Sequence, residues 1–156
     1  MTDEDFMRLA IEKTRTGIAA GQSPFGSVIV KDGEVVAVTH NTVWQTTDPT
    51  AHAEVNCIRA AAAALKTIFL HGCTLYSTTE PCPMCLSAIH WAKIDRVVFG
   101  ATIADAAEAG FHELFVPAKE LARIGHSPLK VEDGLLQKEC AALFREWKQA
   151  AKCGTY

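Results

Sequence analysis

Two short motifs bring together side chains that bind metals and move protons. His52 stands two positions before Glu54, and Cys82 and Cys85 stand three positions apart. Residues three apart on a helix share one face, so both thiols can point to the same place. One imidazole and two thiolates suit zinc, and three protein ligands leave a fourth position for water, as in catalytic zinc sites. The spacing predicts one catalytic zinc ion per chain, held by His52, Cys82 and Cys85.

The carboxylate of Glu54 gives this site a proton carrier. Zinc lowers the pKa of a bound water from about 15.7 to about 7. Glu54 lies close enough to His52 in the sequence to reach that water without binding the metal. It can take the proton of the water and deliver it to a ring nitrogen and then to a departing ammonia.

A structural zinc site is the alternative interpretation, and it needs a fourth protein ligand. The sequence offers four candidates for it: His71, His90, Cys57 and Cys73. The cysteines outside the motif fall in or near apolar patterns typical of buried small side chains: Cys57, Cys73, Cys140 and Cys153. The pairing of H-x-E with P-C-x-x-C favours the catalytic interpretation, since it is the signature of zinc deaminases that act on nucleobases.

The pattern of apolar and turn residues predicts the elements that carry these motifs. Strands are expected at 26–31, 34–41, 73–78, 96–99 and 128–132. Helices are expected at 3–20, 51–65 and 82–92, with one or two short ones in 101–125 and a last one whose apolar face runs from Leu136 to Ala151. A polar loop is expected after the strand at 34–41, and it ends at Asp48–Thr50. Strands that alternate with helices predict an α/β domain in which helices cover a sheet.

The two ligand-bearing helices are expected to begin at the motifs. Their N-termini carry partial positive charge and free N–H groups. Such an environment favours the thiolate form of cysteine and hence metal binding.

Composition limits the classes of protein that fit. The 156 residues are 49% hydrophobic and 21% charged, which is ordinary for a single globular domain covering 1–156. The formal net charge of −3 gives no general nucleic-acid footprint. No apolar run approaches the roughly 20 residues that span a membrane. The acidic start, Met1 to Asp5, is unlike a secretory signal, so a cytoplasmic protein with free thiols is expected.

Four segments resemble the cytidine deaminase-like superfamily, with the closer likeness to bacterial guanine deaminases and tRNA adenosine deaminases. They are Pro24–Gly26, Asp48–Glu54, Glu80–Cys85 and Arg96–Gly100. The resemblance implies three layers, helix–sheet–helix, around a five-stranded mixed sheet. It also implies one zinc per chain and a homodimer, whose two chains could exchange their C-terminal segments.

Three features are similar to guanine deaminases in particular. They are the stretch Ala107–Phe111 with Glu113 after it, Trp91 where tRNA enzymes have a smaller polar residue, and the terminal Tyr156. The segments Arg96–Gly100 and Leu135–Phe144 would suit a tRNA deaminase as well.

The resemblance implies roles for residues around a bound guanine. Glu54 and Glu113 are expected to be catalytic, with Glu113 accepting from the amino group beside C2. The substrate contacts are expected from Phe25, Asn41, Ala53, Trp91 and Tyr156. Water adds at C2, Glu54 protonates N3 and then the amine, and xanthine and ammonia are formed. The tail at 153–156 is expected to cover an active site, its own or that of a partner.

Other functions stay open at this point. A tRNA adenosine-to-inosine deaminase would need a basic surface, and the last helix offers only a modest stripe: Lys138, Arg145, Lys148 and Lys152. A guanosine, cytosine or other aminated-heterocycle deaminase would share the zinc site. A non-catalytic zinc-binding interaction module would have no use for Glu54.

Overall fold

The computed structural model describes residues 1–150 and 152–156 of the chain. Five strands form one mixed sheet in the order β2-β1-β3-β4-β5. Their bounds are β1 Gly26–Lys31, β2 Glu34–His40, β3 Cys73–Thr79, β4 Arg96–Ala101 and β5 Lys130–Glu132. β1 pairs antiparallel with both β2 and β3, whereas β3–β4 and β4–β5 are parallel.

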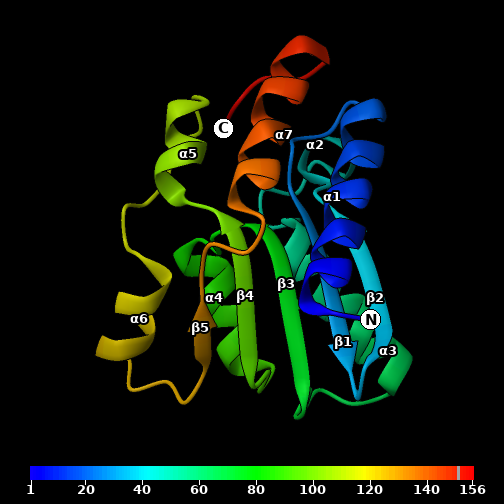
Figure 1. The fold of residues 1–156 in the computed structure, drawn as a ribbon, viewed down its shortest axis with the longest axis vertical. Helices are drawn as coiled ribbons and strands as arrows, with labels where there is room; N and C mark the ends of the chain where they lie inside the picture. Colours follow the sequence, from blue (N-terminus) through cyan, green and yellow to red (C-terminus); the bar gives the residue numbers. More distant parts are fainter. Residues whose placement is uncertain (151) are drawn as a thin grey trace.

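In the described part of the chain, seven helices cover the two faces of this sheet and its edges (Figure 1). Their bounds are α1 Asp3–Ala19, α2 Val43–Thr46, α3 Ala53–Leu65, α4 Pro83–Trp91, α5 Ile103–Glu108, α6 Ala118–Ile124 and α7 Gln137–Ala150. α1, α5 and α7 pack on one face of the sheet, and α3, α4 and α6 pack on the other. The predicted three-layer arrangement with a five-stranded mixed sheet is therefore confirmed.

Successive residues of the strands divide between the two cores. Val28 and Val30 of β1 face α1 and α7, while Ile29 between them faces α3 and α4. This alternation follows from the two-residue repeat of a strand. Because both faces are covered, the central strands are buried almost throughout.

Local signals explain where several elements begin and end. Thr2 caps α1 and exchanges hydrogen bonds with Asp5, which is a capping box. Pro83 occupies the first turn of α4, where its missing N–H costs nothing. Asp32 and Gly33 both have positive φ, 51° and 80°, as a two-residue hairpin between β1 and β2 requires.

The predicted boundaries hold to within a few residues, with two differences. The loop expected between residue 41 and Thr50 contains one helical turn, α2. The last strand, β5, is only three residues long because its pairing with β4 begins at Lys130, opposite the first residue of β4, Arg96. Ala151, expected on the apolar face of the last helix, lies outside the described residues. Across the described chain, no helix combines the length and apolar character needed to cross a bilayer.

Candidate active site

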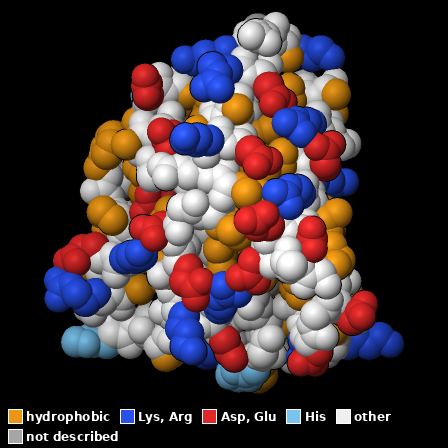
Figure 2. Space-filling model, in the orientation of Figure 1, with side chains coloured by type: hydrophobic (Ala, Val, Ile, Leu, Met, Phe, Trp, Pro, Cys, Tyr) orange, Lys and Arg blue, Asp and Glu red, His pale blue; other side chains and the backbone are white. Residues whose placement is uncertain are grey.

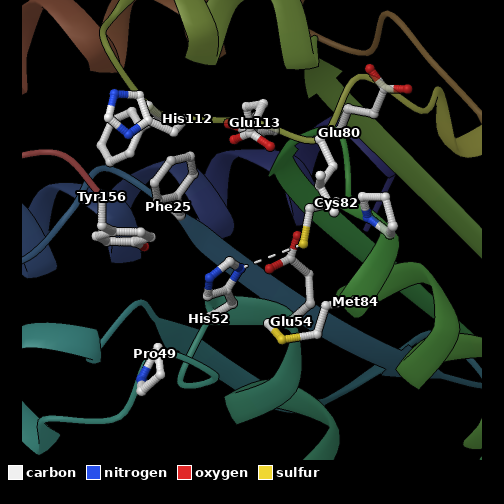
Figure 3. Close-up of a pocket in the computed structure, with 14 residues that line it drawn as sticks. Phe25, Pro49, His52, Glu54, Glu80, Cys82, Met84, His112, Glu113 and Tyr156 are labelled. Carbon is white, nitrogen blue, oxygen red and sulfur yellow. Dashed lines mark hydrogen bonds between the residues drawn. The ribbon is translucent and has the colours of Figure 1, made fainter.

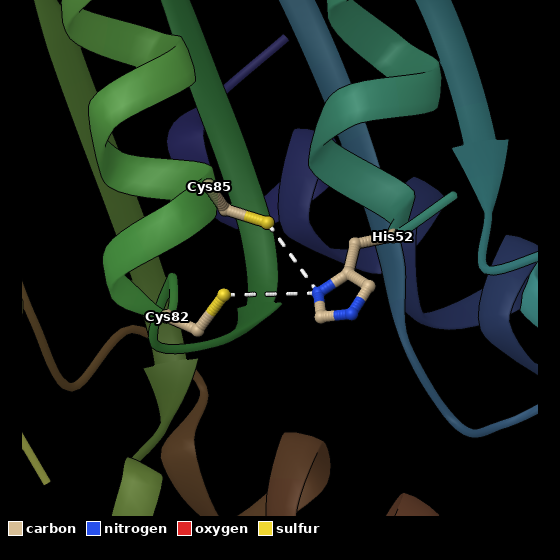
Figure 4. A group of neighbouring side chains, drawn as sticks. All are labelled: His52, Cys82 and Cys85. Carbon is tan, nitrogen blue, oxygen red and sulfur yellow. Dashed lines mark hydrogen bonds between the residues drawn. The ribbon is translucent and has the colours of Figure 1, made fainter. Parts of the chain in front are cut away.

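The three predicted metal ligands converge at the starts of two helices. His52 is the N-cap of α3, Cys82 is the N-cap of α4, and Cys85 lies in the first turn of α4 (Figure 4). The Nδ1 atom of His52 is 3.7 Å from Sγ of Cys82 and 3.5 Å from Sγ of Cys85. All three ligand atoms lie within 4.8 Å of one another.

These separations fit a zinc ion. Tetrahedral zinc, with nitrogen at about 2.0 Å and sulfur at about 2.3 Å, places nitrogen and sulfur ligands about 3.6 Å apart. The donor set of one imidazole and two thiols is also the type that zinc prefers. His52, Cys82 and Cys85 therefore match zinc in both chemistry and spacing.

One of the two thiols is favoured in the form that binds metals. A hydrogen bond from Cys85, followed by one from His52, lowers the pKa of Cys82 to about 4. The hydrogen bond to Cys82, together with burial, raises the pKa of Cys85 well above its usual range. One ligand is thus a thiolate at neutral pH, which is the form that binds metals.

Glu54 is buried beside the ligands, and one of its carboxylate oxygens is held by a hydrogen bond from β3. It lies in the first turn of α3 and is 6% exposed. Ser77 of β3 donates a hydrogen bond of 3.2 Å to its Oε1 atom. Burial and, after it, the negative charge of Cys82 raise the pKa of Glu54. A carboxyl group with a raised pKa can both take and release a proton near neutral pH.

A cavity of about 210 Å³ opens over His52, Glu54 and Cys82 (Figure 3). One wall is aromatic. Phe25 meets Phe111 edge to face with ring centroids 4.9 Å apart, and Phe111 meets Tyr156 in the same manner at 5.5 Å. Such packing gives a rigid apolar wall against which a flat ring can lie.

Glu113 lies across the cavity from His52 and Glu54 (Figure 3). It belongs to the irregular segment between α5 and α6. Burial and, after it, the charge of Cys82 raise the pKa of Glu113 to about 7. This carboxyl can therefore accept or donate a hydrogen bond within the cavity.

Tyr156 lines the cavity, and the buried Asn41 lies behind it and is hydrogen-bonded to it. Asn41 is fully buried, and its Oδ1 atom accepts from the N–H of Val43 at 3.0 Å. Its Nδ2 atom donates to the hydroxyl of Tyr156 at 2.6 Å. The N–H of His112 donates to the carbonyl of Tyr156 at 3.0 Å, which ties the chain end beside the Glu113 segment.

Three of the expected substrate contacts do not line the cavity: Trp91, Ala53 and Asn41, the last of which lies behind Tyr156. Trp91 is 74% exposed and does not line this cavity. Contrary to the expectation, it does not border the substrate site of its own chain. The reason is the length of α4. Trp91 is its last residue, the zinc ligands lie at its start, and nine helical residues span about 13 Å. Ala53 is fully buried between His52 and Glu54 and is not part of the lining either.

The candidates for a fourth protein ligand lie elsewhere. Cys57 and Cys73 are buried in the core beneath α3 and α4. His71 is exposed near Asp95, and His90 is hydrogen-bonded to Ser127. Within the described residues, the ligand group at this site consists of His52, Cys82 and Cys85. Of the other cysteines, Cys140 is buried as expected, whereas Cys153 is only half-buried.

Ser77 and Glu80 support the site and were not singled out from the sequence. Ser77 holds Glu54, as described above. The carboxylate of Glu80 accepts from the N–H groups of Ile103 at 3.0 Å and Ala118 at 2.9 Å. These bonds hold the starts of α5 and α6, and therefore the segment between them that carries Glu113. Their partners are distant backbone groups, which leave no local pattern.

Comparisons with known proteins agree with this geometry. Residues 1–101 match the family of the cytidine and deoxycytidylate deaminase zinc-binding region. A guanine deaminase from Bacillus subtilis is 48% identical over 117 residues, 74% of this chain and 75% of the relative. A tRNA-specific adenosine deaminase from the same organism is 36% identical over 154 residues, 96% of this chain and 93% of the relative. The solved structure of a guanine deaminase from Nitrosomonas europaea superposes with a TM-score of 0.87 at 28% identity, covering 95% of this chain and 85% of that one.

Proposed function

Because this chain belongs to the cytidine and deoxycytidylate deaminase family, we propose that it hydrolyses guanine to xanthine and ammonia. The observation that carries this proposal is the 48% identity to a guanine deaminase, which extends through the zinc motifs. The chain is a zinc-dependent hydrolytic deaminase, with the metal held by His52, Cys82 and Cys85. Bound zinc supplies a Lewis acid that makes water nucleophilic near neutral pH.

Glu54 moves the protons in this proposal. Its carboxylate takes a proton from water and delivers it to N3 of the base as the new C–O bond forms at C2. The carboxylate then takes the proton of the new C2 hydroxyl and gives it to the amino group; the C–N bond breaks, the C2 carbonyl of xanthine forms, and ammonia leaves. The hydrogen bond from Ser77 keeps Oε1 fixed.

The remaining cavity residues orient the base. Phe25 and Phe111 offer the aromatic wall against which a purine would lie. Glu113 accepts a hydrogen bond from the amino group at C2 or from the neighbouring N–H. Tyr156, held by Asn41, binds the opposite polar edge.

The size of the cavity supports a free base. Pockets for drug-sized molecules are about 300–1,000 Å³, and this one is about 210 Å³. The side chain of Tyr156 and the hydrogen bond from Asn41 close one side of it. We propose that residues 153–156 form a cap that excludes water and keeps the substrate small.

The surface gives less support to a tRNA substrate, although tRNA-specific adenosine deaminases are among the relatives. On the face shown in Figure 2, basic and acidic side chains are intermixed. On α7 the predicted basic stripe is interrupted by Glu139 and Glu146, and Glu146 is paired with Arg15. A polyanion gains little from such a surface.

We also propose that two chains form a homodimer. Several large apolar side chains are exposed on or near α4 and α6: Met84, Trp91, Leu114, Phe115 and Ile124. Trp91 borders a groove of about 130 Å³ between these helices, which a second copy could fill. Burying such residues favours association. We place the protein in the cytoplasm, because all six cysteines are free thiols and a reducing compartment keeps them so.

A comparison of substrates tests the proposed activity. Ammonia release by the zinc-loaded protein is measured with guanine, guanosine, adenine, cytosine, cytidine and a tRNA anticodon stem. We expect guanine to give the highest kcat/KM. Faster deamination of the tRNA stem or of a nucleoside would overturn the guanine assignment and leave the zinc deaminase assignment intact.

A further inference from the structure

One amide group, that of Asn56, is surrounded by three hydrogen-bond acceptors. Its Nδ2 atom lies 3.0 Å from the carbonyl oxygen of His40, 2.9 Å from Oγ1 of Thr42 and 3.2 Å from the carbonyl oxygen of Ala51. Two of these are backbone carbonyls, which can only accept. The nitrogen of Asn56 must therefore face them, so the orientation of this amide is determined by its surroundings.

The acceptors belong to the two chain segments that carry the site. His40 and Thr42 flank Asn41, and Ala51 directly precedes His52. The backbone adds one further bond, from the N–H of Thr42 to the carbonyl of Ala51 at 3.0 Å. Asn56 itself lies one turn after His52 on α3, and its N–H donates to the carbonyl of His52 at 2.9 Å.

The loop of residues 41–52 is held at both ends by these hydrogen bonds of Asn56. Residues 41–52 hold only the single turn α2, and Thr47 within it has a positive φ of 53°. Asp48 orders its own neighbourhood by accepting from Thr50. Those bonds are internal to the loop, whereas Asn56 joins both ends of the loop to α3.

We infer that Asn56 is a positioning residue that holds two segments in one frame: the one with the zinc ligand His52, and the one with Asn41, the hydrogen-bond partner of Tyr156 at the cavity. It touches neither metal nor substrate, and it acts through the backbone on both. The part of this inference that concerns Asn41 rests on the proposed function; the part that concerns His52 does not.

The test is to replace Asn56 by alanine and measure two quantities. Zinc affinity is measured by competition with a chromophoric chelator, and kcat and KM are measured with guanine. Groups that orient metal ligands typically contribute 10–100-fold to metal affinity. Because Asn56 acts through the backbone, we expect the lower end: Asn56→Ala weakens zinc binding about tenfold and raises KM about tenfold, with a smaller change in kcat at saturating zinc.

A matched control separates positioning from general stability. Tyr76→Phe removes a part-buried hydroxyl that donates to Asp3 at 2.7 Å, on the face of the sheet that packs against α1 and not on the face that carries the zinc ligands. It should lower the melting temperature but leave zinc affinity and KM unchanged. Equal loss of zinc affinity in both variants, or an unchanged zinc affinity in Asn56→Ala, would overturn the inference.

A milder variant covers the case in which Asn56→Ala fails to fold. Thr42→Val removes one of the three acceptors and keeps the shape of the side chain. We expect a loss of zinc affinity of about threefold, and no change would count against the inference. If the parent protein lacks guanine activity, the proposed function fails, while the zinc measurements still decide the role of Asn56.

Discussion

At the scale of single residues, hydrogen bonds hold the polar groups at and behind the cavity wall. Ser77 donates to Oε1 of Glu54, and the N–H of Val43 donates to Oδ1 of Asn41. The amide nitrogen of Asn41 in turn donates to the hydroxyl of Tyr156, which lines the cavity. Fixing one end limits rotation of the side chain, which keeps the reactive atom aligned with the substrate.

The first prediction at this scale concerns the proton carrier. Glu54→Gln keeps the size and the hydrogen bond from Ser77 but cannot take a proton. Turnover should fall by about a hundredfold or more, the usual contribution of a general acid–base group. Steady-state kinetics with elemental analysis check it, and zinc content should stay at one ion per chain. Near-normal turnover with intact zinc would assign the proton transfer to another group.

The second prediction concerns the acceptor for the amino group. Glu113→Ala should lower kcat/KM for guanine by about tenfold to a hundredfold, because an unpaired buried donor costs about 1–3 kcal/mol. Glu108→Ala is the matched control, since Glu108 is an exposed glutamate in the preceding helix. Equal kinetics for Glu113→Ala and the control would place Glu113 outside the substrate contacts.

At the scale of elements, the site is built where two helix starts meet the ends of two parallel strands. The zinc ligands come from the starts of α3 and α4, and Ser77 comes from β3. Glu80 follows β3 directly and holds α5 and α6 by their first N–H groups. This arrangement leaves the segment with Glu113 and the chain end with Tyr156 as the parts that complete the cavity from outside the core.

The prediction at this scale concerns the C-terminal tail. Deleting Cys153–Tyr156 removes the ring over the cavity and the hydrogen bond from Asn41. Folding and zinc content should be retained, and guanine turnover should fall severely because water enters the site. Tyr156→Phe should be milder, since it keeps the ring and loses the hydroxyl.

Kinetics of the two variants beside the parent protein provide the measurement. Far-UV circular dichroism and zinc analysis confirm that the truncated chain is folded and loaded. Unchanged guanine kinetics in the truncation would show that the tail does not act as a cap.

At the scale of the whole molecule, periodicity was enough to predict the layers but not every contact. Helices and strands repeat locally, so α1, α3, α4 and α7 could be predicted close to their observed bounds. Trp91 was expected at the substrate because it follows the zinc motif closely in the sequence. It is the last residue of α4, however, and the length of this helix separates it from the ligands at the helix start. Asn56 and Glu80 carried no signal, since their partners are backbone groups of other segments that meet only after folding.

The zinc ligands, unlike Asn56 and Glu80, could be predicted from the sequence. Their chemistry depends on side-chain type and on a spacing within one helical turn, both of which are visible in the sequence. The role of Tyr156 depended on resemblance, because no local rule places a chain end over a distant cavity.

A prediction at this scale concerns assembly. The protein should sediment with twice the mass of one chain. Trp91→Glu places a charge among the exposed apolar side chains near α4 and α6, so it should shift the protein toward the monomer. Phe69→Glu is the matched control, because Phe69 is also an exposed aromatic residue but lies in the connection before β3. A parent protein that sediments as a monomer would contradict the proposed dimer.

The most direct test of the central claim is to remove the metal and restore it stepwise. The protein is stripped with a chelator, and conversion of guanine to xanthine is followed by ultraviolet absorbance as zinc is added back. The account predicts no turnover without zinc and a linear rise that ends at one zinc per chain. Undiminished turnover in the stripped protein, or no xanthine with one zinc bound per chain, would contradict it.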